Sequence, residues 1–265
     1  MERHRQPGGG LILTRAQVAE IARREGLPLH AIERDYAQHA FIRHAAKAPL
    51  AFKGGTCLRI VHGSPRYSED LDFDGEASAD AVLGHLEAGA ARLRDYGIPA
   101  EIVRASGSGV QARLRFEGPL FDGTDRSRGS IRLDVSLRRP ARSTEEAFVP
   151  RTAYPDVPQL VLRVLTREHL LAEKTRALLV RGKPRDLYDV HFLVTRGVRC
   201  PRALLDAKMA LYEQRFSLRA LDAGIRAAGL AWAQDLGPLL GQVPPLRPVE
   251  SAVREAFRPF PPRRG

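Results

Sequence analysis

The chain has 265 residues, of which 43% are hydrophobic and 28% charged, and its formal net charge is +11. This composition excludes a disordered chain, and the length allows one large domain or two smaller ones with their own cores. No apolar run reaches the roughly twenty residues that a membrane span needs, so we expect no membrane partner.

Cys57 and Cys200 are the two cysteines of the chain, and they lie far apart in the sequence. We interpret both as free thiols in a reducing compartment. Because the N-terminus does not resemble a signal peptide, we expect a cytoplasmic protein. The positive charge would attract a polyanion such as RNA. Solvated surface and codon bias explain the same charge, and composition alone does not decide between the two.

The first fifty residues predict two helices after a loose tail at residues 1–10. Thr14 opens an amphipathic helix, with Gln17 as its capping-box partner, and this helix ends at residues 26–28. A second helix covers about residues 30–47. The pair is compatible with a helix-turn-helix that reads DNA, or with packing around a catalytic sheet.

The most informative stretch follows a short apolar lead at residues 49–53. Gly54-Gly55-Thr56 then opens a short helix that extends to about His62. Two glycines let the backbone approach a bulky anion closely, and free N–H groups at a helix start favour phosphate. This corner therefore predicts a phosphate-binding site.

An Asp-Leu-Asp pair begins after thirteen further residues, within a predicted strand over residues 69–74. Asp70 and Asp72 point to one face of that strand, whereas Leu71 points to the other. Two adjacent carboxylates repel each other unless a cation neutralises them. Mg²⁺ suits this position because it binds one or two carboxylates and completes its shell with water and phosphate oxygens. The pair therefore predicts a magnesium site beside the phosphate corner.

Beyond this strand the pattern predicts one helix and then three strands, over residues 79–96, 100–104, 111–117 and 130–137. The polar loop 118–129 is a candidate substrate-facing loop. Asp134 interrupts the last strand, where an aspartate is disfavoured by propensity. It either completes a three-carboxylate site with the Asp-Leu-Asp pair or forms a salt bridge with Arg132 or Arg113.

Residues 139–158 contain four prolines, and we expect an irregular segment and a domain boundary there. The boundary separates an N-terminal domain over residues 1–150 from a mainly helical domain over residues 159–265. Residues 159–165 form a short apolar strand or lead-in. The periodicity then predicts helices over about residues 166–180, 184–193, 201–214, 217–228 and 231–240, followed by a Pro- and Arg-rich tail.

Charged residues in the first two of these helices form a second cluster. Lys174 lies mid-helix among apolar residues, so it either snorkels outward or reaches an anion. Beside a triphosphate, its compact charge would neutralise the phosphates. Asp186 and Asp189 are three residues apart and share one helix face, from which they would orient Lys174 or the nucleotide. An ordinary salt bridge between helices is the alternative.

The Gly-Gly-Thr corner followed by Asp-x-Asp resembles the signature of the DNA polymerase beta-like nucleotidyltransferase superfamily. More narrowly, residues 52–56 and 64–73 look like the AbiEii/AbiGii toxin family, which includes the MenT-like toxins. The four motifs of that family are matched in order at residues 54–72, Asp134, Lys174 and residues 185–189. The resemblance implies an α+β chain, with a mixed sheet and flanking helices followed by a C-terminal helical bundle.

The resemblance also implies roles for individual residues. The residues implied to be catalytic are Asp70, Asp72, Asp134, Lys174 and Asp189. The three carboxylates among them on predicted strands would hold Mg²⁺, and Asp134 would take the proton from the attacking hydroxyl. The residues implied to bind the nucleotide are Lys53, Gly54, Gly55, Thr56, Ser68, Lys174 and Asp186. Lys174 and Asp189 would reach the catalytic cleft from the helical domain.

The implied function is that of a toxin of a type IV toxin–antitoxin or phage-defence system. Such an enzyme would transfer nucleotides from a nucleoside triphosphate to RNA, above all to the 3′ end of tRNA, and so block translation. A cognate antitoxin would be its protein partner, and a phosphate placed on Ser68, two residues before Asp70, would repel the metal-binding carboxylates. Two alternatives stay open: a nucleotidyltransferase that modifies a small molecule or a protein, and a non-catalytic nucleic-acid-binding module.

Overall fold

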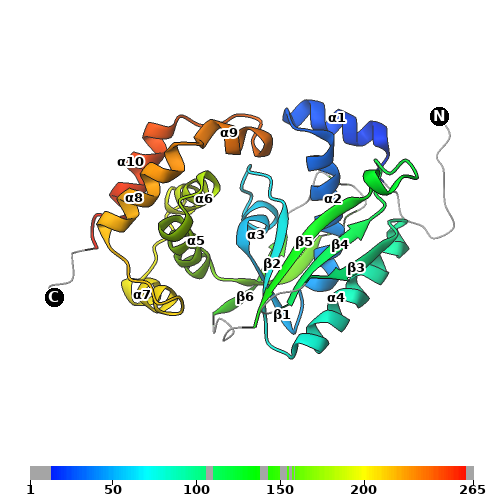
Figure 1. Ribbon diagram of the computed structural model, residues 1–265, viewed down its shortest axis with the longest axis horizontal. Coiled ribbons are helices and arrows are strands. Elements are labelled where there is room, and N and C mark those ends of the chain that lie inside the picture. Colours follow the sequence, from blue (N-terminus) through cyan, green and yellow to red (C-terminus); the bar gives the residue numbers. More distant parts are fainter. Residues whose placement is uncertain are drawn as a thin grey trace. The chain divides into compact units, whose positions relative to one another are not determined.

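A computed structural model describes residues 13–105, 110–137, 143–149, 154, 157 and 159–260 of the chain. The tail expected at residues 1–10 lies outside the described residues. The chain divides into two compact units, residues 1–164 and residues 165–265 (Figure 1). The first unit is built on a mixed sheet, and the second is helical. Within the described ranges, no helix is long and apolar enough to cross a membrane.

The strands of the first unit, in chain order, are β1 (Leu50–Lys53), β2 (Asp70–Gly75), β3 (Ala100–Arg104), β4 (Val110–Phe116), β5 (Gly129–Ser136), β6 (Thr144–Val149) and β7 (Leu160–Leu165). They form one sheet in the order β3-β4-β5-β2-β1-β7-β6. β2 pairs in parallel with β5, and β1 with β7, whereas β1–β2, β3–β4 and β4–β5 are antiparallel. The four strands predicted between residues 69 and 137 are confirmed to within one residue at each end.

The two faces of this sheet differ in polarity because side chains alternate along each strand. Leu71 and Phe73 of β2 are fully buried on one face. Helices α2 (Leu29–Ala45) and α4 (Ala79–Leu93) pack against each other, α2 contacts β5, and α4 contacts β3 and β4 (Figure 1). The opposite face carries the polar side chains of the same strands, so functional groups are displayed on that side of the sheet.

The N-terminal helices pack on this unit rather than project from it. α1 (Arg15–Glu25) begins after Thr14, and the side chains of Thr14 and Gln17 form the predicted capping box. α2 contacts α1, α4 and β5, and most of its residues are buried. This favours the packing interpretation over a DNA-reading helix-turn-helix, because a recognition helix has to lie exposed in the groove.

Two segments differ from the expectation. Strand β6 lies inside the region 139–158 that was expected to be irregular, and it pairs beside β7 at the edge of the sheet. Its two adjacent glutamates obscure the alternation of a strand. Helix α10 (Leu246–Phe257) replaces the expected C-terminal tail. The buried residues of α10 occur at every fourth position and are Val249, Val253 and Phe257. Charged residues lie between them and dominate the composition of the helix.

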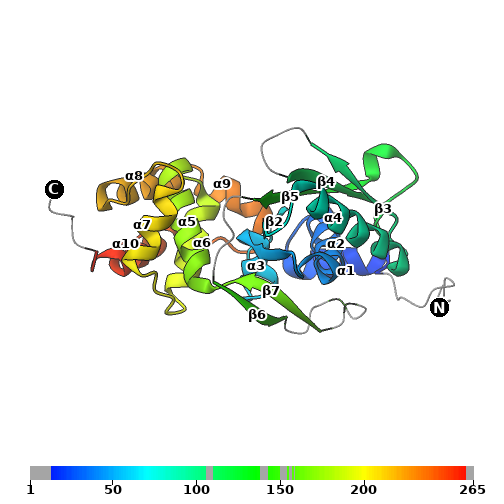
Figure 2. The ribbon, with the colours of Figure 1, turned by 90° about the horizontal axis from the view of Figure 1, so that it is seen from below.

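The second unit is a helical bundle, as the resemblance implied. Its helices are α5 (Arg167–Arg181), α6 (Pro184–Val194), α7 (Arg202–Ala210), α8 (Leu218–Gly229), α9 (Trp232–Leu236) and α10 (Figure 2). α5 contacts α6, α7 and α8, and α6 contacts α10. A Cβ at Gly224 of α8 would lie 2.5 Å from the carbonyl oxygen of Leu178, so a glycine is needed for α8 to approach α5 this closely.

Candidate active site

Carboxylates from two neighbouring strands share the polar face of the sheet. In the parallel pair β2–β5, Asp72 lies opposite Asp134 and Asp70 lies opposite Arg132. Paired residues of parallel strands point to the same side, so all four side chains lie on one face. The three carboxylate residues are each only partly buried. The register therefore places Asp134 beside the Asp-Leu-Asp pair.

Gly54 brings the backbone into contact with this carboxylate strand. It is the first residue of α3 (Gly54–Ile60), which packs against β1 and β2. Its φ of +80° lies in the left-handed region, which glycine adopts without steric cost. A Cβ at this position would lie 2.0 Å from Oδ2 of Asp72. The glycine corner and Asp72 therefore form one site, because no other residue would leave room for both.

Gly55 has equally close neighbours from the loop that precedes β2. A Cβ at Gly55 would lie 2.5 Å from Nη2 of Arg66 and 2.8 Å from Oγ of Ser68. Ser68 therefore lies at the glycine corner. Arg66 is 2% exposed; it lies in the segment 64–73 that carries the family resemblance, but the sequence analysis assigned it no role.

Two residues predicted to bind the nucleotide hold the corner to β2. The Nζ atom of Lys53 lies 2.7 Å from Oδ1 of Asp74, whose side chain is almost completely buried. The Thr56 hydroxyl donates a hydrogen bond to the carbonyl oxygen of Asp70. Asp74 was not among the predicted site residues, although the alternation that pairs Asp70 with Asp72 extends to it.

Arg132 is a neighbour of the carboxylates that the sequence assigned differently. It forms an ion pair with Asp70, and the hydrogen bond to that carboxylate, followed by its charge, raises the pKa of Arg132. Among the described residues, no ion pair reaches Asp134. The salt bridge considered for Asp134 is therefore made by Asp70 instead, and Asp134 keeps a partly exposed carboxylate.

The carboxylates fit a hard divalent cation in residue type, shared face and strand register. Two carboxylates on one strand and a third on the next provide oxygen ligands of the kind that Mg²⁺ binds. In the described ranges, no three such side chains converge closely enough to hold a metal ion as they stand, and Asp70 contacts Arg132. Residues of suitable chemistry are thus assembled on one face of the sheet.

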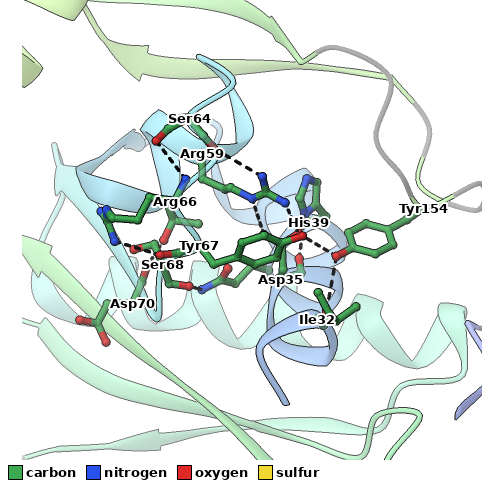
Figure 3. A network of polar contacts seen from close by, with 12 residues as sticks. Ile32, Asp35, His39, Arg59, Ser64, Arg66, Tyr67, Ser68, Asp70 and Tyr154 are labelled. Atoms are coloured by element: carbon green, nitrogen blue, oxygen red, sulfur yellow. Dashed lines mark hydrogen bonds and ion pairs between the residues drawn. The ribbon is translucent and has the colours of Figure 1, made fainter. Parts of the chain in front are cut away.

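A buried polar network joins α2, α3 and the loop before β2 (Figure 3). Asp35 of α2 is 2% exposed and accepts hydrogen bonds from the Tyr154 hydroxyl at 2.7 Å and from Nε of Arg59 at 3.3 Å. The Arg59 guanidinium lies 3.7 Å from the centre of the Tyr67 ring. Burial raises the pKa of both tyrosines, so their hydroxyls stay protonated at neutral pH. The sequence carried no clear signal for this network, because Asp35 is one of several charged and polar residues of α2.

In the second unit, two buried aspartates of α6 bind different cations of α5. The Nζ atom of Lys174 lies 2.7 Å from Oδ2 of Asp189, which is fully buried. Asp186, also fully buried, accepts hydrogen bonds of 2.6 and 2.7 Å from the guanidinium of Arg181. The salt bridge between helices that the sequence offered as an alternative is therefore present. It joins Lys174 to Asp189 and leaves Asp186 to Arg181.

A family model described as "Nucleotidyl transferase AbiEii toxin, Type IV TA system" matches residues 37–259 of the chain. This match covers most of both units and contains every predicted site residue. No curated protein sequence is similar enough to match.

Three solved structures resemble the fold. MenT4, the nucleotidyltransferase toxin Rv2826c from Mycobacterium tuberculosis H37Rv, has a TM-score of 0.69 and 22% identity, covering 92% of this chain and 88% of its own. JHP933 from Helicobacter pylori has a TM-score of 0.58 and 19% identity, covering 88% of this chain and 92% of its own. A putative nucleotidyltransferase from H. pylori has a TM-score of 0.60 and 19% identity, covering 88% and 95%. At these identities, the likeness shows that the fold is shared.

Proposed function

The chain belongs to the AbiEii family of nucleotidyltransferase toxins of type IV toxin–antitoxin systems, and on this basis we propose that it transfers nucleotides from a nucleoside triphosphate to RNA. The acceptor we propose is the 3′ end of tRNA, where an added nucleotide would block aminoacylation and hence translation, in a system that defends against phage. The observation that supports this most is the strand register that sets Asp72 opposite Asp134, with Gly54 against Asp72.

The glycine corner would receive the triphosphate. Because Gly54 and Gly55 carry no side chains, the backbone of Gly54 lies against Asp72, and that of Gly55 lies against the partly exposed Ser68. Lys53 adds a positive charge next to the corner, although its ammonium group also binds Asp74. Thr56 contributes by tying the corner to the Asp70 carbonyl, which keeps the phosphate-binding backbone and the carboxylates at a fixed separation.

Asp70, Asp72 and Asp134 would hold Mg²⁺, which when bound neutralises phosphate charge and stabilises the transition state. The Asp134 carboxylate would accept the proton from the RNA hydroxyl, because it is partly exposed and no ion pair reaches it in the described part of the chain. The hydroxyl oxygen then forms a bond to the α-phosphorus while the bond to the leaving pyrophosphate breaks. The proton ends on Asp134, and the RNA gains one nucleotide.

Lys174 is the second cation that we propose for the triphosphate. Lys174 carries a compact charge of the kind that binds β- and γ-phosphates. Asp189 fixes its direction through the 2.7 Å ion pair, so we propose that Asp189 positions Lys174 for the nucleotide. Asp186, which was expected to bind the nucleotide, would contribute by holding α6 to α5 through Arg181.

The distribution of charge supports RNA rather than a small molecule as the acceptor. Residues 165–265 contain 18 Lys and Arg against 10 Asp and Glu, so this part of the chain carries +8 of the net +11. Its arginines include exposed ones at Arg199, Arg215 and Arg226. Such a basic surface attracts the phosphates of a nucleic acid, whereas a small acceptor would need only a local pocket.

The proposed function is tested by direct transfer. The purified chain is incubated with each of the four labelled ribonucleoside triphosphates, Mg²⁺ and total tRNA, and the RNA is resolved on a denaturing gel. We expect lengthened, labelled RNA with at least one triphosphate and none when EDTA is present. Parallel reactions with candidate small molecules and with bulk protein test the other acceptors. No transfer to RNA with any of the four would overturn the proposal.

The close contact between Gly54 and Asp72 gives a prediction with a matched control. Gly54→Ala should lower the transfer rate by about a hundredfold, because the new methyl group displaces the Asp72 carboxylate by roughly an ångström. Gly63→Ala is the control, since Gly63 also has a positive φ, of +72°, but nothing lies within 4 Å of a Cβ there. Both changes cost about 1–2 kcal/mol of backbone strain. Equal transfer rates for the two variants would contradict the steric argument.

A further inference from the structure

Resting on the proposed function, we propose that Arg66 is a positioning residue for the triphosphate. It holds the Ser68 hydroxyl and the Gly55 backbone together as one anion-binding corner, here called the Ser68 corner. The family motifs and the sequence pattern singled out Gly55 and Ser68, but gave no role to Arg66.

Three groups meet at Gly55. The position of a Cβ on Gly55 would be 2.5 Å from Nη2 of Arg66 and 2.8 Å from Oγ of Ser68. The Arg66 guanidinium and the Ser68 hydroxyl therefore both lie against the Cα of Gly55. The Ser68 hydroxyl is a donor that suits a phosphate oxygen, and the Arg66 guanidinium occupies the space that a side chain at position 55 would take.

Side-chain donors fix the backbone around Ser68. Nη1 of Arg66 donates a hydrogen bond of 2.9 Å to the Tyr67 carbonyl, and Nε2 of Gln38 donates one of 3.1 Å to the Ser68 carbonyl. The carbonyl groups immediately before and after the Ser68 Cα are thus both held. Arg66 supplies one of these two bonds, so its loss would free one side of Ser68.

The rest of the loop is anchored to α2, which gives Arg66 a rigid base (Figure 3). Arg59 is bound by Asp35 of α2, lies over the Tyr67 ring and points toward the Ser64 carbonyl at 3.4 Å. Arg34 of α2 forms an ion pair of 2.9 Å with Glu69, at the other end of the loop. Loop residues on both sides of Arg66 are therefore held by one helix.

The difference in burial defines what Arg66 does. Arg66 is 2% exposed, whereas Ser68 is only partly buried, so a ligand meets Ser68 and Arg66 acts through it. A buried guanidinium has already lost its conformational freedom when the protein folds, so no further ordering is needed when the phosphate binds. Donors fixed in this way are the preorganised groups that bind developing or permanent negative charge best.

A double-mutant cycle tests the proposal with triphosphate binding as the readout. Dissociation constants for the nucleoside triphosphate used in transfer and for inorganic triphosphate are measured by calorimetry for the wild type, S68A, R66Q and the double variant. We expect S68A and R66Q each to weaken binding by about tenfold, the size expected for one hydrogen bond to a charged group. The double variant should bind about as weakly as the weaker single variant, because Arg66 acts through Ser68.

Arg23→Gln is the control, because it removes an exposed guanidinium that pairs with Glu20 of the same helix, α1. It should bind triphosphate as the wild type does. Thermal unfolding checks that R66Q is folded, and if it is not, R66K replaces it in the same cycle, since lysine keeps the charge but not the fork of donors. Wild-type binding by R66Q or R66K, or losses that multiply in the double variant, would overturn the positioning role.

The outcomes also separate this inference from the proposed function. If the wild-type chain binds triphosphate but lengthens no RNA, RNA transfer is refuted. The double-mutant cycle still decides the role of Arg66 in that case, because its readout is triphosphate binding. If the R66Q variant lengthens RNA at the wild-type rate and its KM for the triphosphate is unchanged, only the role of Arg66 is refuted. A wild-type chain that binds no triphosphate would refute both.

Discussion

Replacing Asp72 with asparagine should reduce nucleotide transfer by at least about a hundredfold while the chain stays folded. Asp72 lies at the centre of the polar face, opposite Lys53 of β1 on one side and Asp134 of β5 on the other. Its Oδ2 atom is the group nearest to a Cβ placed on Gly54. Asparagine keeps the shape of the side chain but loses the negative charge that a divalent cation needs. The transfer assay and thermal unfolding are measured on the same preparation.

Asp74 provides the contrast on the same strand. Asp74→Asn removes the negative charge that lies 2.7 Å from the largely buried Lys53 ammonium. Removing one member of a buried ion pair costs about 3–5 kcal/mol, so this variant should unfold at a clearly lower temperature than Asp72→Asn. The pair of variants thus separates a catalytic carboxylate from a structural one, two residues apart. An unstable Asp72→Asn beside a stable, inactive Asp74→Asn would reverse the assignment.

The carboxylate strand β2 was predictable because its chemistry and its periodicity coincide. Asp70 and Asp72 flank Leu71, and a period of two places both carboxylates on the face opposite the core. Asp134 was predictable for the same reason, since an aspartate in an apolar strand demands an explanation. These signals are local, so they need no knowledge of which segments meet in the fold.

Contacts between distant segments could not be predicted in this way. Asp35 and Tyr154 are 119 residues apart, yet they form one of the hydrogen bonds of the network that joins α2 to the loop before β2. Arg66 is one of many arginines in a chain with 42 basic residues, and only the fold shows that it meets Gly55. The helix α10 was missed because its buried stripe is sparse and lies between charged residues and a proline.

The sequence also could not decide which partner each charged residue has. Lys53 and Thr56 follow the family pattern of nucleotide binding, but in the structure they contact Asp74 and the Asp70 carbonyl. Likewise, the spacing of Asp186 and Asp189 places them on one helix face but leaves their partners open. The fold gives Arg181 to Asp186 and Lys174 to Asp189, because only the packing of α5 on α6 determines which cation faces which carboxylate.

Asp189→Asn should both destabilise the helical unit and stop nucleotide transfer. Asp189 is fully buried, and the side chain of Lys174 is 12% exposed, so the variant leaves a largely buried ammonium group without its countercharge. Breaking such a pair from one side costs about 3–5 kcal/mol. Urea unfolding followed by circular dichroism measures the loss in stability, and the transfer assay at low temperature measures activity in the folded chain.

The double variant Lys174→Met with Asp189→Asn separates these two effects. It removes the unpaired charge, and a neutral side chain of similar length fills the same space, so much of the lost stability should return. Transfer should stay low, because the cation proposed to bind the triphosphate is gone. Recovery of both stability and transfer would show that the pair is structural and that Lys174 has no role at the nucleotide.

Asp186→Asn tests the other ion pair between α6 and α5, which joins Asp186 to Arg181. Arg181 is 46% exposed and can turn to water when its partner loses charge, so the cost should be smaller, about 1.5–3 kcal/mol for a hydrogen bond to a charged group. Transfer at saturating nucleotide should stay close to the wild-type rate in the folded chain. A folded Asp186→Asn variant that has lost nucleotide transfer would instead make Asp186 the functional carboxylate of α6. Arg181 and Lys174 of α5 would then have exchanged the roles proposed for them.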